Sequence, residues 1–467
     1  MSRSPEQSAP PGGIRTSLTG WGRTAPSVAA VHGPRTAAHV AELLRGAGAR
    51  GILARGLGRA YGDAAQNAGG EVVAMTGLCA VHALDAAAGR VELDAGVSLD
   101  ALLALTIPRG WLPPVLPGTR HVTVGGAIAS DVHGKNHHRD GGFCDHVEAF
   151  ELLTPGGDRL AVTPGATPDA FAATAGGIGL TGVVLRATLR LTPLETAWMA
   201  VDTERAPDLD ALLELMASDD DAHRYSVAWL DCLARGRRLG RSVLTRGDHA
   251  RAAQLPAAAG RDALHPPAPA RLAAPTGLPG GLLSRPAIAA FNEARFRRAP
   301  RLERGRLQPL ASYFFSLDAL RGWNRLYGPR GFVQYQLAVP RGAEETLRTI
   351  VERTSRARAA CCLAVLKRMG PARGLLSFPQ EGWTLALDFP AAAPGLRELL
   401  DGFDELVAHA GGRVYLAKDA RLRPELVRAM YPQLPRWNAI RAQLDPDATM
   451  RSDLARRLRL TDDGAGA

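Results

Sequence analysis

The chain has 467 residues, 46% of them hydrophobic and 22% charged, and its formal net charge is +10. These proportions are those of a folded globular protein and exclude a fibrous or wholly disordered chain. Of the 56 basic residues, only Lys135, Lys367 and Lys418 are lysines. Because a guanidinium group is planar and keeps its proton, each remaining lysine marks a position where a compact ammonium group could be needed.

Composition also limits the partners and the location. Five cysteines without a C-x-x-C motif argue against a disulfide framework and against a structural zinc site. Scattered arginines predict that the protein binds no nucleic acid. No run of about 18 apolar residues and no secretion signal is visible, so we expect a protein that is cytoplasmic or peripheral to the inner membrane or cell envelope.

In chain order, the first elements alternate between strand and helix. Residues 1–19 are rich in Pro, Gly and Ser and are expected to form a disordered tail. Apolar periodicity predicts helices at 35–47 and 99–105, with Ser98 as the N-cap of the second. Strands are predicted at 51–55, 91–95, 147–153, 159–162 and 183–191.

A change of character after residue 195 predicts a boundary between a domain at 20–195 and a second one at 196–412. The second domain contains a Pro/Ala/Gly-rich stretch at about 255–290, which we expect to be flexible. Its regular elements are strands at 331–339 and 383–389 and helices at 344–356 and 396–410. This order of elements indicates an α+β fold.

Three glycine-rich segments lie beside predicted strands of the first domain, at 54–63, 117–138 and 175–182. Glycine lets backbone N–H groups approach a flat or phosphorylated ligand closely. The first segment lacks the G-x-G-x-x-G spacing, so a Rossmann site is disfavoured, and taken alone it could be a cluster of β-turns. Three such segments predict one extended ligand threaded among them, but their spacing does not identify it.

The second segment also holds a concentration of histidines. Five of the 12 histidines lie between His121 and His146. A metal site would need convergent ligands, and the adjacent His137 and His138 point apart in an extended chain, so we expect no bound metal. The alternative is a redox or acid–base site, because neutral imidazoles can share protons near neutral pH.

The glycine-rich segments resemble the PCMH-type FAD domain of the vanillyl-alcohol-oxidase flavoproteins. The resemblance runs from Gly20 to Leu460 and includes Y-L-A-K-D at 415–419. Two motifs narrow it to the decaprenylphosphoryl-β-D-ribose 2′-oxidase family: H-G-K-N-H-H at 133–138 and Q-Y-Q at 334–336. It implies a two-domain PCMH-type FAD-binding fold with a mixed-sheet substrate (cap) domain. Residues 413–460 would return to the FAD domain, and 461–467 would form a tail.

The resemblance also implies an activity. With FAD, members oxidise the ribose C2′ hydroxyl of decaprenylphosphoryl-β-D-ribose to a 2′-keto sugar, the first half of epimerisation to decaprenylphosphoryl-arabinose for cell-wall arabinan. A short-chain-dehydrogenase-type reductase would reduce the ketone, and an acceptor such as a quinone would re-oxidise the flavin. The lipid-linked sugar implies peripheral membrane contact. The alternative is an FAD-dependent oxidase of a non-lipid sugar, alditol or aldonolactone, and covalent as well as non-covalent FAD stays open.

The resemblance assigns site residues to three groups. The cofactor group is Arg55, Gly56, Leu57, Gly58, Arg59, Ala60, Tyr61, Gly62, Asp63, Gly118, Thr123, Val124, Gly125, Gly126, Ser130, Asp131, Val132, His133, Val184 and Tyr415. The substrate group is Lys135, Trp229, Phe314, Gln334, Gln336, Lys367 and Lys418. Lys418, Tyr61 and His133 are the catalytic candidates, because oxidation of a hydroxyl needs a base for its proton.

Departures from the family pattern fall in the substrate group and its surroundings. Phe314 stands where members have a tyrosine, Thr384 where asparagine is expected and Ala386 where some have cysteine. These departures bear on the substrate rather than on the flavin. A structural alternative also exists for three residues: Gln334 and Gln336 could form a solvent-facing strip, and Trp229 could belong to the core.

Overall fold

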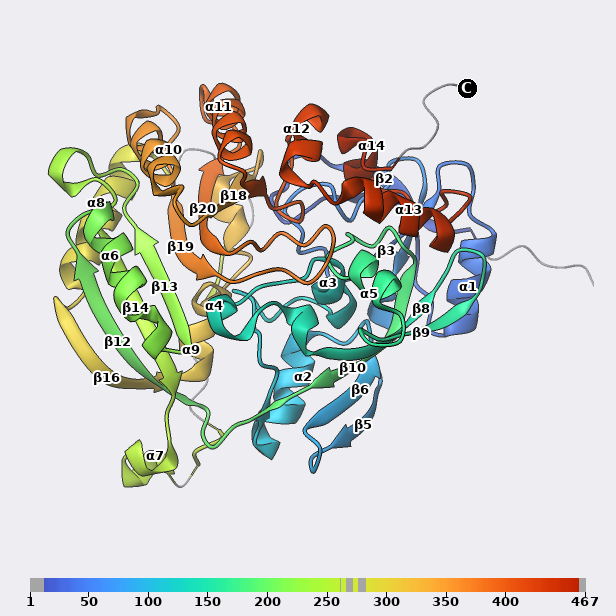
Figure 1. The fold of residues 1–467 in the computed structure, drawn as a ribbon, viewed down its shortest axis with the longest axis horizontal. Helices are drawn as coiled ribbons and strands as arrows, with labels where there is room; N and C mark the ends of the chain where they lie inside the picture. The colour runs from blue at the N-terminus through green and yellow to red at the C-terminus, as the bar shows by residue number, and fades with distance from the viewer. Residues whose placement is uncertain (1–11, 261, 266–271, 276–282, 462–467) are drawn as a thin grey trace, which may run out of the picture.

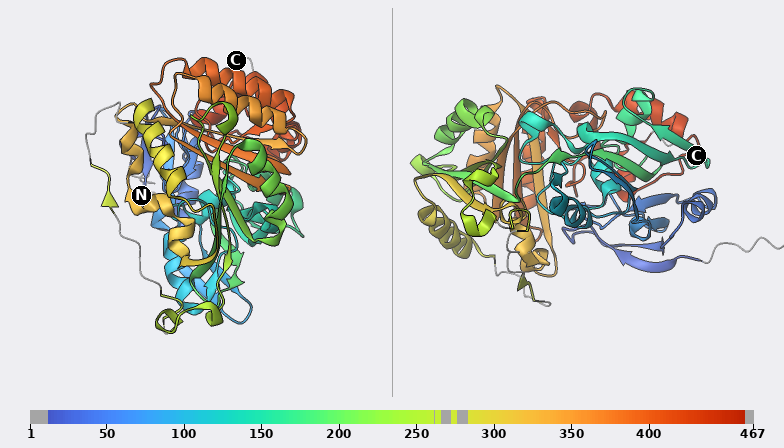
Figure 2. Two further views of the ribbon diagram at one scale, coloured as in Figure 1. Left: turned by 90° about the vertical axis from the view of Figure 1, so that its left-hand side faces the viewer. Right: turned by 90° about the horizontal axis from the view of Figure 1, so that it is seen from below.

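The computed structural model describes residues 12–260, 262–265, 272–275 and 283–461. Two smaller sheets with their helices lie at one end of the molecule and an eight-stranded sheet lies at the other (Figure 1). Figure 2 shows the same division from below, with the blue and teal segments at one end and the green and yellow segments at the other. The predicted α+β architecture is confirmed.

The first small sheet contains the strand that leads into the first glycine-rich segment. Its order is β1 (Ile14–Leu18), β2 (Ser27–His32), β4 (Glu71–Ala74) and β3 (Ile52–Arg55). Helix α1 (Ala37–Arg45) buries Val40, Leu43 and Leu44 against it, and Thr36 caps the helix by accepting a hydrogen bond from the His39 amide. The expectation of a disordered tail up to residue 19 was wrong for 14–18, because this segment pairs with β2. Residues 1–11 of that tail and 462–467 of the C-terminal one lie outside the described residues.

The second small sheet has the order β5 (Val81–Asp85), β6 (Arg90–Asp94), β10 (Val183–Arg190), β8 (Val147–Leu153) and β9 (Arg159–Val162). Helix α2 (Leu99–Thr106) begins where Ser98 accepts a hydrogen bond from the Ala101 amide, which confirms the predicted cap. The second glycine-rich segment, expected as a loop, contains a short helix, α3 (Val124–Ala129), whose apolar side is buried against β10. Helix α5 (Pro168–Thr174) precedes the third glycine-rich segment.

The large sheet builds the second domain. Its order is β16 (Leu302–Pro309), β12 (Trp198–Ala206), β14 (Ser242–His249), β13 (Tyr225–Leu230), β19 (Leu363–Met369), β20 (Gly382–Pro390), β18 (Phe332–Pro340) and β21 (Arg413–Val414). A mixed sheet was expected, but the pairings run antiparallel throughout. Helices α6 (Leu209–Asp219), α10 (Glu344–Arg356) and α11 (Leu396–His409) cover one face, where alternate strand residues such as Leu244, Leu366 and Leu385 are buried.

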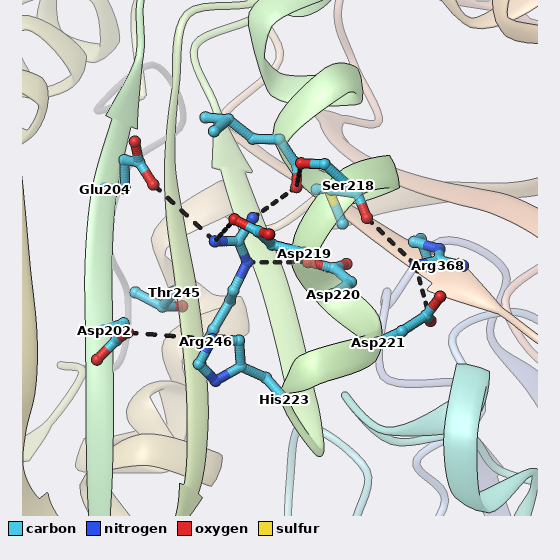
Figure 3. Close-up of polar contacts among 12 residues, drawn as sticks. Asp202, Glu204, Ser218, Asp219, Asp220, Asp221, His223, Thr245, Arg246 and Arg368 are labelled. Carbon is cyan, nitrogen blue, oxygen red and sulfur yellow. Dashed lines mark hydrogen bonds and ion pairs between the residues drawn. The ribbon is translucent and has the colours of Figure 1, made fainter.

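The helix-covered face also holds buried arginines, each paired with carboxylates (Figure 3). Arg246 on β14 is 3% exposed, and its Nε donates to Asp220 at 3.0 Å while its NH2 donates to the Leu215 carbonyl at 2.6 Å. Arg368 on β19 donates to the Asp221 carboxylate at 3.0 Å and to the Met216 carbonyl at 3.2 Å. These bonds fix the end of α6 to the sheet.

The opposite face of the large sheet carries the predicted substrate residues. Register places Gln334 opposite Asp388 and Gln336 opposite Ala386, and one strand further it places Lys367 opposite Thr384. Because side chains alternate along a strand, Gln334 and Gln336 share this face with Lys367. The predicted solvent-facing alternative for the two glutamines is wrong, since Gln336 is only 3% exposed and Gln334 lines a cavity described below.

After β21 the chain runs back over the first domain through α12 (Pro424–Met430), α13 (Leu434–Leu444) and α14 (Asp453–Leu458). Helix α13 packs on α5, Met450 forms a bridge with Ile52, and Arg457 pairs with Asp63 at 2.7 Å. The C-terminal segment therefore contacts both parts of the molecule and can hold residues 415–418 at their junction.

The remaining helices and strands are short except for α8, which has 14 residues. They are β7 (Trp111–Leu112), α4 (His137–Asp140), β11 (Thr192–Pro193), α7 (Ala257–Gly260), β15 (Leu272–Ala273), α8 (Arg285–Arg298), α9 (Leu310–Phe314) and β17 (Leu320–Arg321). The stretch expected to be flexible at 255–290 contains α7, β15 and the start of α8, while 261, 266–271 and 276–282 lie outside the described residues. None of the described helices is long and apolar enough to cross a membrane.

Candidate active site

A cavity of about 300 Å³ lies where the two parts of the molecule meet. Its wall includes the first glycine-rich segment, α3, strands β18 and β19, and residues 415–418. The structure brings these residues of the predicted site together in one wall: Gly56, Leu57, Gly58, Arg59, Ala60, Tyr61, Gly118, Thr123, Gly126, Ser130, Val132, His133, Gln334, Gln336, Lys367, Tyr415 and Lys418.

The first glycine-rich segment presents unsatisfied donors to this cavity. Within the described chain, no acceptor is found for the backbone N–H groups of residues 57–60. Gly58 has φ +64°, and a Cβ added at Gly118 would meet only open space. Successive N–H groups around a left-handed residue form a nest that binds anions. The segment therefore fits the pyrophosphate of a dinucleotide such as FAD.

Some predicted cofactor residues instead hold this segment in place. Arg55 donates to the carbonyls of Thr19 and Ala65, and Asp63 accepts from Arg457. A Cβ at Gly62 would lie 1.8 Å from the Asp419 carbonyl oxygen, so only glycine lets the C-terminal segment approach here. None of these three residues lines the cavity.

The same holds for four predicted cofactor residues further along the first domain. Val124, Gly125, Asp131 and Val184 lie behind the wall. Asp131 is buried, and its carboxylate accepts from the Ser377 hydroxyl at 2.6 Å and from the Cys144 amide at 3.1 Å. It therefore ties the turn before His133 to the second domain.

His133 lies in an aromatic part of the wall. Its ring centroid is 5.6 Å from that of Phe378 and 5.4 Å from that of Tyr415, whose hydroxyl donates to the Ser130 carbonyl. Gln336 Nε2 donates to His133 Nε2 at 2.9 Å, so the imidazole proton must lie on Nδ1. Burial first, and then the positive charges of Lys367 and Lys418, hold the pKa of His133 well below its usual range, so the ring is neutral.

Lys418 and Tyr61 meet in the same cavity wall. The Lys418 Nζ lies 3.5 Å from the centroid of the Tyr61 ring. Burial lowers the pKa of Lys418 to about 7, although nearby Asp388 raises it. Burial also raises the pKa of Tyr61 well above its usual range, so the phenol stays protonated. Near neutral pH, Lys418 can therefore exchange a proton, whereas Tyr61 keeps its proton and takes part only through hydrogen bonds and its ring.

Asp388 is a residue of the site that the sequence did not reveal. Its carboxylate accepts from Gln334 Nε2 at 2.6 Å, and burial raises its pKa to about 7. The signal was present, because Asp388 is the one charged residue in the predicted strand at 383–389. Only the register with β18 shows that it faces the cavity side of the sheet.

Three predicted substrate residues are not in the cavity wall, which corrects that prediction. Lys135 donates to the Tyr313 carbonyl and lies 4.0 Å from the centroid of the Tyr313 ring. Phe314 packs in the same aromatic cluster, 4.9 Å from the Tyr225 ring. Trp229 is 6% exposed beneath Arg295, which is the structural alternative foreseen for it.

Sequence comparisons with known proteins support an FAD site at this cavity. A family model described as an FAD binding domain matches residues 28–163, and one described as D-arabinono-1,4-lactone oxidase matches residues 384–458. Decaprenylphosphoryl-β-D-ribose oxidase from Mycolicibacterium smegmatis is 43% identical over 95% of this chain and 97% of its own. L-gulono-1,4-lactone dehydrogenase from Mycobacterium tuberculosis is 25% identical over 91% of this chain and 94% of its own.

The FAD-binding domain joined to a cavity with polar side chains from a second sheet defines an FAD-dependent oxidoreductase. Within that class, the identity over nearly the whole of both chains is decisive. The chain belongs to the decaprenylphosphoryl-β-D-ribose oxidase family.

Proposed function

We propose that this protein oxidises the ribose C2′ hydroxyl of decaprenylphosphoryl-β-D-ribose to the 2′-keto sugar. The observation that carries the proposal is the 43% identity, over 95% of this chain, to a relative named for oxidising that lipid-linked ribose. FAD, when bound, supplies the acceptor for the hydride that leaves C2′. The backbone N–H groups of residues 57–60 would hold its pyrophosphate, and His133 and Tyr415 would border its ring system.

Lys418 is the base in this proposal. A hydroxyl that loses a hydride must also lose its proton, and a base works best when its pKa lies near the working pH. Burial lowers the pKa of Lys418 to about 7, whereas His133 already uses Nε2 to accept from Gln336. Tyr61 would hold the Lys418 ammonium over its ring and steer it toward the hydroxyl.

Gln334 and Gln336 would bind the sugar hydroxyls through hydrogen bonds. Each amide uses its NH2 group on the protein: Gln334 donates to Asp388, and Gln336 donates to His133 and to Thr384 Oγ1. The carbonyl oxygens are therefore left to accept from hydroxyl groups of the substrate. When ionised, Asp388 would position Gln334, because a carboxylate can only accept and so fixes which end of the amide faces it.

The chemistry of the product and of the substrate indicates which partners the protein would need. A 2′-keto sugar reduced on the opposite face gives the arabinose epimer, so a short-chain-dehydrogenase-type reductase is the proposed partner. The proposed re-oxidant is a quinone. Because the substrate is a lipid, the protein would work at the surface of a membrane, held there by peripheral contact.

The test is direct. Purified protein loaded with FAD is mixed anaerobically with farnesylphosphoryl-β-D-ribose, and the flavin absorbance near 450 nm is followed. Bleaching, with a 2′-keto product seen by mass spectrometry, is expected. The model match to D-arabinono-1,4-lactone oxidase motivates the rival arm: bleaching by free aldonolactones or alditols but not by the lipid-linked ribose would replace this substrate.

A further inference from the structure

Lys367 is a partly buried cation whose side chain lines the cavity wall without a counter-ion among the described residues. Among the described residues, no acceptor bonds to its Nζ and no carboxylate pairs with it. Burial alone lowers its pKa to about 8, and no nearby carboxylate opposes this effect. A buried ammonium group without a partner is costly, so such a group is normally kept for an anion that arrives with a ligand.

Two other lysines lie near Lys367. The charge of Lys367 lowers the pKa values of Lys135 and Lys418, so these groups lie close enough to interact with it. Asp388, the carboxylate that shifts Lys418, has no such effect on Lys367. No carboxylate of the described residues therefore offsets the charge of Lys367, and an anion of the ligand can do so.

Register gives the wall a polar–apolar–polar order. Val365 and Ala386, paired across β19 and β20, form an apolar floor between Lys367 and the Gln336 side. Strand spacing and rise put the Cα atoms of Lys367 and Gln336 about 12 Å apart. The lysine side chain and a ribosyl phosphate together span such a gap, with the sugar on the floor and the phosphate at the ammonium group.

We propose that Lys367 is the phosphate subsite of this cavity: its ammonium group binds a phosphoryl oxygen of the polyprenylphosphoryl ribose while Gln334 and Gln336 bind the sugar. This inference rests on the proposed function, whose residues for catalysis lie elsewhere in the wall. It assigns the discrimination between a phosphorylated sugar and a neutral one to a single side chain.

The experiment compares wild type, Lys367→Met, Lys367→Arg and Arg341→Gln, all loaded with FAD. Arg341→Gln is the matched control, because it removes one positive charge from an exposed position of the same domain. For Lys367→Met we expect the KM for farnesylphosphoryl-β-D-ribose to rise about 30-fold or more while kcat changes less than about threefold. Lys367→Arg restores KM to within about fivefold, and the control matches wild type.

A second measurement does not depend on the substrate. Inorganic phosphate should raise the melting temperature of wild type above that in chloride of equal ionic strength, and this rise should be lost in Lys367→Met only. If wild type leaves the lipid-linked ribose unchanged but keeps this phosphate effect, the proposed function falls and the anion subsite stands. If wild type oxidises the lipid and Lys367→Met has a KM within twofold of it, the subsite is refuted and the function stands.

Flavin content guards against another role for the side chain. All four proteins should carry equal FAD, measured by absorbance after denaturation. Loss of FAD from Lys367→Met alone would mean that the ammonium group serves the cofactor, which would overturn the proposal.

Discussion

Lys367 and Arg368 are consecutive residues of β19, and they lie in opposite environments. Lys367 faces the cavity, has no bonded acceptor among the described residues, and its pKa is lowered to about 8 by burial. Arg368 points to the helix-covered face, where it donates to Asp221 and to the Met216 carbonyl (Figure 3). The strand thus places one cation where it awaits a ligand and the next where its bonds are complete.

The comparison extends to the two faces of the sheet. Arg246, like Arg368, is matched by carboxylates and carbonyls on the helix-covered face, whereas Lys418 and Lys367 line the cavity. Guanidinium suits the first environment because its fixed donors satisfy several acceptors and it never loses its proton. An ammonium group suits the second, because at Lys418 it can give up its proton and at Lys367 it presents a compact charge to one anion. In a chain with 53 arginines, the positions of the three lysines therefore carry information.

The largest effect should come from making the cavity resemble the other face. Lys418→Arg keeps the positive charge but removes the ability to act as a base, so kcat should fall about 10³-fold, or about 4 kcal/mol. Single-turnover reduction of the bound flavin by the lipid-linked ribose measures it. The kcat of Lys418→Met should fall by as much. A Lys418→Arg protein that retains a third of wild-type turnover would show that Lys418 contributes charge rather than proton transfer.

Removing a buried arginine from the helix-covered face should lower the stability of the protein and leave its catalytic activity unchanged. Arg246→Met leaves Asp220, which is fully buried, without its partner, and such losses cost about 3 kcal/mol or more. Urea unfolding of the FAD-loaded protein measures this loss in the free energy of unfolding. Arg304→Met is the control, since Arg304 pairs with Asp202 on the same sheet but is mostly exposed. Equal stability of the two variants would refute the distinction.

A smaller effect concerns pH. If Lys418 is the base, kcat/KM should rise with pH through about 7, because only the free amine accepts a proton. The Asp388 carboxylate raises the pKa of Lys418, so Asp388→Asn should lower that pKa and move the rise to lower pH. The measurement is the pH profile of kcat/KM for both proteins. A midpoint that stays in place, or moves to higher pH, would show that the Asp388 charge does not raise the pKa of the catalytic base.

Local sequence patterns predicted much of the fold. The helix at 344–356 and the strand at 147–153 are confirmed residue for residue, because each is a periodic run with clear ends. The pattern could not show that 14–18 forms a strand, since its partner, β2, is supplied by tertiary pairing. Nor could it show the helix at 124–129, whose glycines have poor helix propensity and which is stabilised by packing on β10.

The site residues show the same difference between local sequence motifs and tertiary packing. Motifs within one segment, such as residues 56–61 and Tyr415 with Lys418, were placed correctly in the cavity wall. Asp388 was not predicted, and Trp229 and Phe314 were predicted but lie outside the wall, because such positions depend on strand register and on how the aromatic cluster around Tyr313 packs. A resemblance transfers residue types well, but which side of a wall they occupy is settled by side-chain packing.

The smallest effect should come from charges that neither face uses. Arg436 pairs with Asp169 at 2.8 Å, and both side chains are more than half exposed. Water screens such a pair, and holding two long side chains together costs entropy, so Arg436→Gln should change the free energy of unfolding by less than about 0.5 kcal/mol. Urea unfolding at low and high salt checks this value. A loss comparable to that of Arg246→Met would mean that burial does not decide which arginines matter, and the contrast between the two faces of β19 would lose its physical basis.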